Sequence, residues 1–318
     1  MLLLSVTLLA LSFFWLDRRL RCAGLLLRLE KSERPGWLAH YRERPVVASD
    51  YAFAGGRGRL YRPVPAGDAP GVVLAHGMHE EGVTEPRLVG LARALAGAGF
   101  VVLTPEVPGL ARYRITHGDV DVIAAAARAL AADRSRPKVT VFGISFGGGL
   151  ALRAACEPKN QGAIGRVIGL GAYHDAGRVS RFYLGEPALG PHGERAPVEP
   201  HPYGRVALWM SLYGERHTGE FSEAERLRAL GGVAARGPEL DLASPRTCSQ
   251  PVHVPLFLVH GTGDRVVPYT ETLWNAQQFG LQTSVHTLVS PAIAHAEYAP
   301  PSWRERVGLI EFIAGALY

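Results

Sequence analysis

A serine flanked by glycines lies where a predicted strand meets a predicted helix. The motif Gly-Ile-Ser-Phe-Gly at 143–147 follows the β-branched run 138–142 and precedes a helix-like stretch that begins at Leu150. A sharp strand-to-helix turn crowds the backbone, and glycines leave room for a serine at its apex. The motif lacks the Lys-Ser/Thr of a P-loop and the glycine spacing of a dinucleotide site. We therefore predict that Ser145 is a nucleophile, with a purely structural glycine-rich turn as the alternative.

A nucleophilic serine needs a base and an acid, because a serine hydroxyl near its ordinary pKa reacts poorly. His295 is the candidate base, in a loop between the last predicted strand and the last predicted helix. Asp264 is the candidate acid, in a turn that follows an apolar predicted strand, and Asp175 is the alternative acid. We expect Ser145, Asp264 and His295 to meet as a catalytic triad, because acid and base follow the serine in that order in one large hydrolase fold.

Acyl transfer also needs hydrogen-bond donors for the negative charge that develops on the carbonyl oxygen. We assign this oxyanion hole to the backbone N–H groups of Met78 and Phe146. His76 is expected to bond the loop backbone beneath the site. His79 is followed by glutamate, but Val83 occupies the place of the second histidine of a metalloprotease motif. The sequence therefore predicts neither a metal nor a cofactor.

Short β-branched runs alternate with longer alanine- and leucine-rich stretches from Gly56 onward. This alternation predicts an α/β fold with a mostly parallel sheet flanked by helices. The predicted strands are 59–62, 71–75, 100–104, 138–142, 166–170, 255–259 and 283–288. The predicted helices are 85–98, 120–133, 146–156, 270–279 and 303–316.

The alternation stops after Leu170 and resumes at Pro255. An unstructured loop of that length is improbable. We therefore predict a helical cap insertion at about 173–252 that covers Ser145, with helical pieces near 206–213 and 222–230. Most of its large side chains are expected to form the cap's own core, with the substrate pocket as the alternative: Tyr173, Phe182, Tyr183, Tyr203, Trp209 and Met210. Arg178 and Arg181 are expected to be solvated. The alternative is that they bind a carboxylate of the substrate.

The N-terminal residues 1–16 carry no charge, and a charged segment follows at 17–21. That length falls between a signal-peptide core and a membrane span of about 20 residues. We predict a hydrophobic helix within 1–22 that anchors the protein to a membrane, a lead-in at 23–55 and a hydrolase domain at 56–318. Arginines after the apolar run would hold the enzyme on the cytoplasmic side. The alternatives are a helix that packs on the protein or dimerises, and a cleaved signal with an exported enzyme.

The composition excludes several other classes. With 47% hydrophobic and 20% charged residues, the 318-residue chain is typical of a globular protein and not of a disordered one. Its net charge is +5, and the arginines are scattered, so nucleic-acid binding is not expected. The three distant cysteines indicate no disulfide framework and no Cys-x-x-Cys motif, which fits a reducing compartment.

Taken together, these motifs resemble the α/β-hydrolase superfamily, in particular its dienelactone-hydrolase-like and cap-bearing esterase branches. The motifs are the His-Gly at 76–77, the elbow around Ser145, the Gly-x-Gly-Asp turn that ends at Asp264, and His295. The resemblance implies hydrolysis of an ester, thioester or amide of a small acyl substrate. Dienelactone hydrolases have cysteine at the elbow, so that activity does not transfer. Ala294 stands where the superfamily often has glycine.

Three functions of different classes follow from this sequence. The first is a serine hydrolase that works through an acyl-enzyme. The second is an acyltransferase that uses the same triad with an acceptor other than water. The third is a non-catalytic, membrane-tethered binding module with the hydrolase fold. The intact serine, acid and histidine favour the first.

Overall fold

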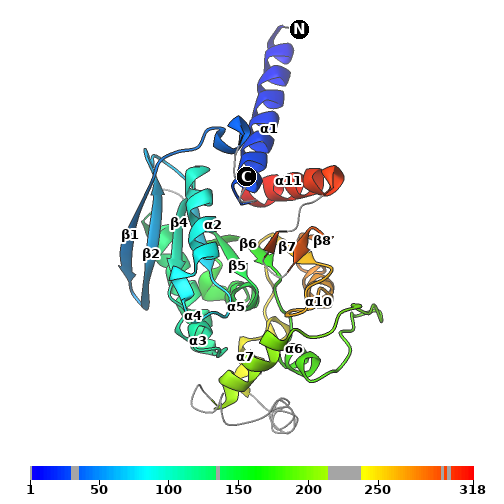
Figure 1. The fold of residues 1–318 in the computed structure, drawn as a ribbon. Helices are drawn as coiled ribbons and strands as arrows, with labels where there is room; N and C mark the ends of the chain where they lie inside the picture. Colours follow the sequence, from blue (N-terminus) through cyan, green and yellow to red (C-terminus); the bar gives the residue numbers. More distant parts are fainter. Residues whose placement is uncertain (1, 30–35, 134–136, 214–237, 295–296, 299–301) are drawn as a thin grey trace.

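An eight-stranded, mostly parallel sheet forms the centre of the computed structural model, which describes residues 2–29, 36–133, 137–213, 238–294, 297–298 and 302–318 (Figure 1). The strand order is β1-β2-β4-β3-β5-β6-β7-β8. β1 and β2 pair antiparallel, as do β2 and β4, and the remaining pairs are parallel. The strands are β1 (Val46–Phe53), β2 (Gly56–Pro63), β3 (Gly71–Ala75), β4 (Val101–Pro105), β5 (Val139–Ile144), β6 (Ile164–Leu170), β7 (Leu256–Gly261) and β8 (Val285–Ser290).

Helices cover both faces of the sheet, so the predicted α/β architecture is confirmed. One face packs against α4 (His117–Ala132) and α5 (Phe146–Ala155), and the other against α2 (Pro86–Gly97) and α11 (Trp303–Leu317). Along β5, Val141 belongs to the first core, whereas Phe142 and Ile144 face the second. The structure also contains α3 (Pro108–Ala111), α10 (Thr270–Phe279) and a small hairpin of β9 (Ile293–Ala294) and β10 (Glu297–Tyr298).

β1 is a strand that the sequence pattern did not predict. It lies within the predicted lead-in 23–55, so the sheet begins before the predicted start of the hydrolase domain at residue 56. Its residues are only partly buried or exposed, as expected of an edge strand that pairs on one side. Such a strand lacks the continuous apolar run that identifies the central ones.

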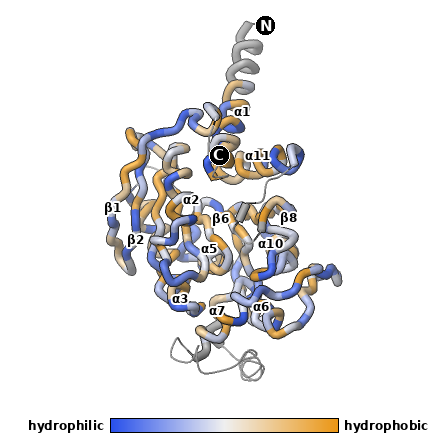
Figure 2. Tube along the Cα trace, in the orientation of Figure 1, coloured by the Kyte–Doolittle hydropathy of each residue, from blue (hydrophilic) through white to orange (hydrophobic). Residues whose placement is uncertain are grey.

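Helix α1 (Leu2–Leu29) runs without a break through the apolar and charged N-terminal segments. Its first turns extend away from the body, while its last turns lie beside α11 (Figure 1). Cys22, Leu25 and Leu26 are buried there, and Arg19 pairs with Glu311 of α11. Figure 2 shows hydrophobic residues predominating at the end of α11 beside α1.

The membrane anchor predicted for residues 1–16 has no support in the structure. Within the described ranges, no helix combines the length and the apolar character needed to cross a bilayer. Charged residues end the apolar run at Asp17, and the helix continues as a part of the folded domain. From Cys22 to Leu29, α1 fits the alternative of a helix that packs on the protein.

Between β6 and β7 the described residues form α6 (Ala176–Tyr183), α7 (Pro202–Tyr213) and α9 (Pro238–Ala243). The predicted helical piece at 206–213 is confirmed as part of α7. The piece predicted at 222–230 lies outside the described residues. The three helices lie below the sheet in Figure 1, on the side of the C-terminal strand ends. Parallel α/β sheets carry their ligands at that edge.

A disulfide joins Cys156, which follows α5, to Cys248, which precedes β7. The cysteine spacing gave no indication of this bond, because the fold brings together residues 92 apart, with 5.7 Å between their Cα atoms. Cys22 is a free, buried thiol, and burial raises its pKa to about 12. Disulfides of this kind are typical of oxidising compartments. The prediction that the cysteines form no disulfide is wrong for Cys156 and Cys248.

Candidate active site

Ser145 occupies the apex of the turn from β5 to α5, with φ of 53° and ψ of −123°. A positive φ at a non-glycine residue costs about 1–3 kcal/mol and persists only where the surroundings enforce it. A Cβ on Gly147 would lie 2.2 Å from the carbonyl oxygen of His76. A Cβ on Gly143 would lie 2.3 Å from the carbonyl oxygen of Gly147. The steric need for both motif glycines is thus confirmed.

The serine borders a cavity of about 1000 Å³. Near Ser145 its wall is formed by Gly77, Met78 and Phe146, and Tyr203 contributes from the start of α7. Further from the serine, the cavity is lined by residues of α1, α2 and α11. A carbonyl group bound in this cavity can reach the serine hydroxyl although the residue itself is only 4% exposed.

Asp264 is buried in the turn after β7, beside the end of β6. Its Oδ1 accepts hydrogen bonds from the N–H groups of Val266 (2.8 Å) and Val267 (2.9 Å). The Ser145 N–H donates to the carbonyl of Leu170 at 2.7 Å. Gly171, which follows Leu170, has φ of 63°, and a Cβ there would lie 3.4 Å from Asp264 Oδ2. Ser145, after β5, and Asp264, after β7, therefore lie on either side of the C-terminal end of β6.

His260 supports the Asp264 turn and was not singled out from the sequence. It is completely buried at the end of β7. Its Nε2 lies 2.7 Å from the carbonyl oxygen of Val267 and 3.4 Å from Asp264 Oδ2. Because the carbonyl can only accept, Nε2 donates, and Nδ1 accepts from the Thr272 hydroxyl at 2.8 Å. The signal in the sequence is a histidine at the end of an apolar strand, four residues before an aspartate.

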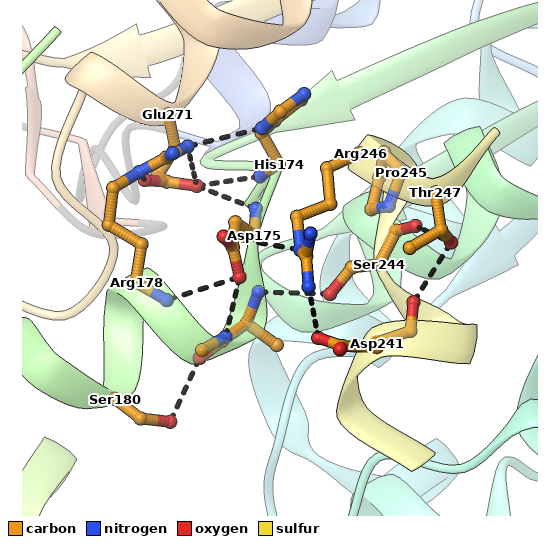
Figure 3. A network of polar contacts seen from close by, with 12 residues as sticks. His174, Asp175, Arg178, Ser180, Asp241, Ser244, Pro245, Arg246, Thr247 and Glu271 are labelled. Carbon is orange, nitrogen blue, oxygen red and sulfur yellow. Dashed lines mark hydrogen bonds and ion pairs between the residues drawn. The ribbon is translucent and has the colours of Figure 1, made fainter. Parts of the chain in front are cut away.

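Asp175, the alternative acid, has both carboxylate oxygens engaged elsewhere. Oδ1 caps α6 by accepting from the N–H groups of Gly177 (2.8 Å) and Arg178 (3.1 Å). Oδ2 lies 3.3 Å from Nε of Arg246. Figure 3 shows Asp175 inside this network. These contacts give Asp175 a structural role, and Asp264 stays the predicted acid.

The same network binds the insertion to the body of the protein (Figure 3). The buried carboxylate of Glu271, on α10, accepts from the backbone N–H groups of His174 and Asp175. It also accepts from Arg178, with 2.6 Å between Nε and Oε1. Arg178 is therefore neither solvated nor directed at a substrate, because Glu271 already provides the carboxylate that it binds.

Met78 and Phe146, the predicted oxyanion donors, line the same cavity as Ser145. Phe146 is the first residue of α5, where a backbone N–H has no acceptor within the helix. Tyr203, in the insertion, holds the backbone of Met78, because its hydroxyl donates to the Met78 carbonyl oxygen at 2.6 Å. Both residues thus border the cavity at Ser145, and their role as oxyanion donors stays a prediction.

His76 has the structural role expected of it. Nε2 accepts from the N–H of Val107 at 3.2 Å, so Nδ1 donates to the carbonyl oxygen of Gly77 at 2.7 Å. Burial lowers the pKa of the imidazole, although the Gly77 carbonyl opposes the shift. The neutral ring therefore holds the loop after β3 against the loop after β4.

The stability of the protein should depend on pH through His76. Its folded-state pKa is lowered from 6.5, so below about that pH the unfolded chain binds more protons than the folded protein does. The free energy of unfolding should decrease from about pH 6.5 downward, by at most about 1.4 kcal/mol per pH unit for this residue. Urea unfolding of wild type and His76→Gln across this range measures the effect.

The matched control is His253→Gln, at an exposed position. It should leave the slope of stability against pH unchanged, whereas His76→Gln should reduce it. Part of the slope should remain in His76→Gln, because burial also lowers the pKa of His174. An unchanged slope in His76→Gln would show that this histidine is not kept neutral by the fold.

His295, the candidate base, lies outside the described residues. Described residues on either side are Ala294 and Glu297, which pair across the β9–β10 hairpin. Ile293, two residues before the histidine, lines the same cavity as Ser145.

The large residues of the insertion divide between core and cavity. Tyr173, Phe182, Tyr183 and Trp209 are buried in the main core. Tyr203 is the member of this group that lines the cavity in the described part of the chain. Four of the six are therefore buried as expected, but in the core shared with the sheet, α4 and α5 and not in a core of the cap's own.

Comparison with known proteins agrees with this architecture. A family model described as "Alpha/beta hydrolase family" matches residues 72–298. No match was found among curated protein sequences. Three solved structures of similar fold share 12–16% sequence identity with the chain, so they inform the fold alone.

An acylaminoacyl peptidase from Pyrococcus horikoshii has a TM-score of 0.55 and 16% identity, over 89% of this chain and 43% of the peptidase. The chain thus spans less than half the length of that protein. An esterase from Pyrococcus furiosus has a TM-score of 0.54 and 12% identity, over 86% and 92% of the two chains. An esterase from Pyrobaculum calidifontis has a TM-score of 0.52 and 16% identity, over 95% and 92%.

Proposed function

The chain belongs to the alpha/beta hydrolase family, and from this membership we propose that it is a serine hydrolase that cleaves carboxylic esters through an acyl-enzyme. The observation that carries the proposal is Ser145, held at positive φ on the turn between β5 and α5 and open to a largely apolar cavity. Thioesters and amides are substrates of the same chemistry. The catalytic residues are Ser145, Asp264 and His295.

In the first step, His295 takes the hydroxyl proton as Ser145 Oγ forms a bond to the carbonyl carbon. The N–H groups of Met78 and Phe146 stabilise the oxyanion of the tetrahedral intermediate. The bond from carbon to the leaving oxygen then breaks, and the alcohol departs with the proton from His295. In the second step, water gives a proton to His295 and attacks the acyl-enzyme. The acid is released, and the proton returns to Ser145.

Asp264 orients His295 and stabilises its charged form. The buried carboxylate is fixed at Oδ1 by two backbone N–H groups, and Oδ2 lies beside Gly171 at the end of β6. The position of Ile293 in the cavity wall supports the approach of His295 to the serine from β9.

Ester hydrolysis by the purified protein tests this function against its alternatives. With p-nitrophenyl butyrate, a hydrolase releases one butyrate for each p-nitrophenolate. An acyltransferase instead diverts the acyl group to an added alcohol or thiol and forms a new ester or thioester. A non-catalytic module binds without turnover. Absence of turnover by folded protein would contradict the proposal.

A further inference from the structure

The cavity at Ser145 continues along one face of the sheet to helix α1. On the sheet side it is lined by Phe142 and Ile144 of β5 and by Ile168 and Leu170 of β6. The opposite walls come from three helices, α1, α2 and α11. Most of their side chains are apolar, and they include Leu25, Leu29, Leu91, Leu95, Phe312 and Ile313. Arg28 of α1 and Arg87 of α2 also line the cavity, and the Arg28 guanidinium donates to backbone carbonyls of Ala39 and Ala94.

The central strand of the sheet is incompletely covered on this face. β5 lies between β3 and β6, a position where both faces of an α/β sheet are normally buried. Phe142 and Ile144 nevertheless remain only partly buried, as do Leu91 and Ile313 across the cavity. Apolar surface that faces water is unfavourable. The protein therefore leaves apolar surface free at its centre for an apolar occupant.

The cavity has a mostly apolar end along α11 and a polar end at the serine. Along α11 its lining residues extend from Leu309 to Leu317, about 12 Å at 1.5 Å per residue. At the serine, His201, Tyr203 and Arg265 contribute polar groups from the insertion and the Asp264 turn. A substrate with a long apolar part and a polar part, joined at the reacting carbonyl, matches this division.

We propose that the apolar part of the cavity, called here the acyl channel (Phe142, Ile144, Leu91 and Ile313 with their neighbours toward α1), binds a long acyl chain of the substrate. This inference rests on the proposed function, because it places the carbonyl carbon at Ser145. The acyl tail lies between the sheet and α11 and points to α1. The alcohol portion lies at the polar end, beside His201, Tyr203 and Arg265.

Substrate length gives the first test. Burial of a methylene is worth about 0.8 kcal/mol, or roughly three- to fourfold in affinity. The kcat/KM of p-nitrophenyl esters should therefore rise from acetate through butyrate and octanoate to laurate. Between butyrate and octanoate the expected increase is at least about tenfold. A profile that falls after butyrate would overturn the proposal.

Filling the channel gives the second test. Ile313→Trp, on α11, should lower the laurate-to-butyrate ratio of kcat/KM by at least about tenfold, because indole occupies the path of the tail. Val307→Trp, at an exposed position on the same helix, should leave both values as in wild type. Leu91→Trp repeats the test from the opposite wall, in case Ile313→Trp does not fold. An unchanged ratio in a folded channel variant would overturn the proposal.

Failure of the acyl channel can be told from failure of the proposed function. If folded wild type cleaves no ester of any length, the hydrolase function itself fails. If acetate and butyrate esters are cleaved through Ser145 but longer ones are not, only the channel fails. Calorimetry of laurate with Ser145→Ala protein measures binding without turnover. Binding there, weakened by Ile313→Trp in the same background, supports the channel, and its absence contradicts it.

Discussion

Replacement of Ser145 by alanine is expected to lower kcat with p-nitrophenyl butyrate by at least about 10⁴-fold. The loss is large because the oxygen that forms the acyl-enzyme is removed, and the base and oxyanion donors left behind provide only a small residual rate. The fold should be retained. Alanine fits where Ser145 lies, and it meets a positive φ no less readily than serine does.

The control is Ser180→Ala, because Ser180 is also buried but bonds the Ala176 carbonyl within α6. This variant should keep kcat within a few-fold of wild type. Thermal unfolding of both variants separates catalysis from folding. Substantial ester hydrolysis by Ser145→Ala would contradict the assignment of the nucleophile.

The second largest effect is expected from Asp264→Asn, with a loss of about 10⁴-fold in kcat. Asparagine keeps an oxygen for the N–H groups of Val266 and Val267, so the turn should persist. What disappears is the negative charge that orients the histidine and stabilises its protonated form. The pH profile of kcat/KM should show the apparent pKa of the base shifted downward, because the neutral amide no longer favours the imidazolium.

Asp175→Asn provides the comparison between the two candidate acids. It should leave kcat nearly unchanged and instead lower stability, because Asp175 caps α6 and pairs with Arg246. Kinetics and urea unfolding of the two variants give a direct ranking. If Asp175→Asn abolished turnover and Asp264→Asn did not, the acid would be Asp175.

The parts of the site that the sequence predicts are those that local sterics or strand order determine. The glycines around Ser145 are required by backbone atoms within a few residues or on the adjacent loop. The position of Asp264 follows from an apolar strand that ends in a glycine-rich turn. Each parallel strand places its C-terminal turn at the same edge of the sheet, so motifs distant in sequence meet there.

Features that depend on long-range packing could not be predicted. The Cys156–Cys248 disulfide joins residues far apart in the chain. The α1 residues that line the cavity, Leu25, Leu26 and Leu29 among them, lie in the segment 23–55 that was predicted only as a lead-in. The ion pair between Arg178 and Glu271 could not be predicted without knowing how α10 packs. In each case a partner distant in sequence determines the role.

Reaction with a fluorophosphonate tests the central claim most directly, because this reagent phosphonylates only an activated serine. The folded protein should take up one equivalent, and mass spectrometry of the digest should place the adduct on the peptide with Ser145. Ser145→Ala should not react. Absence of an adduct on folded wild type, or equal labelling of Ser145→Ala, would contradict the assignment of Ser145 as the catalytic nucleophile.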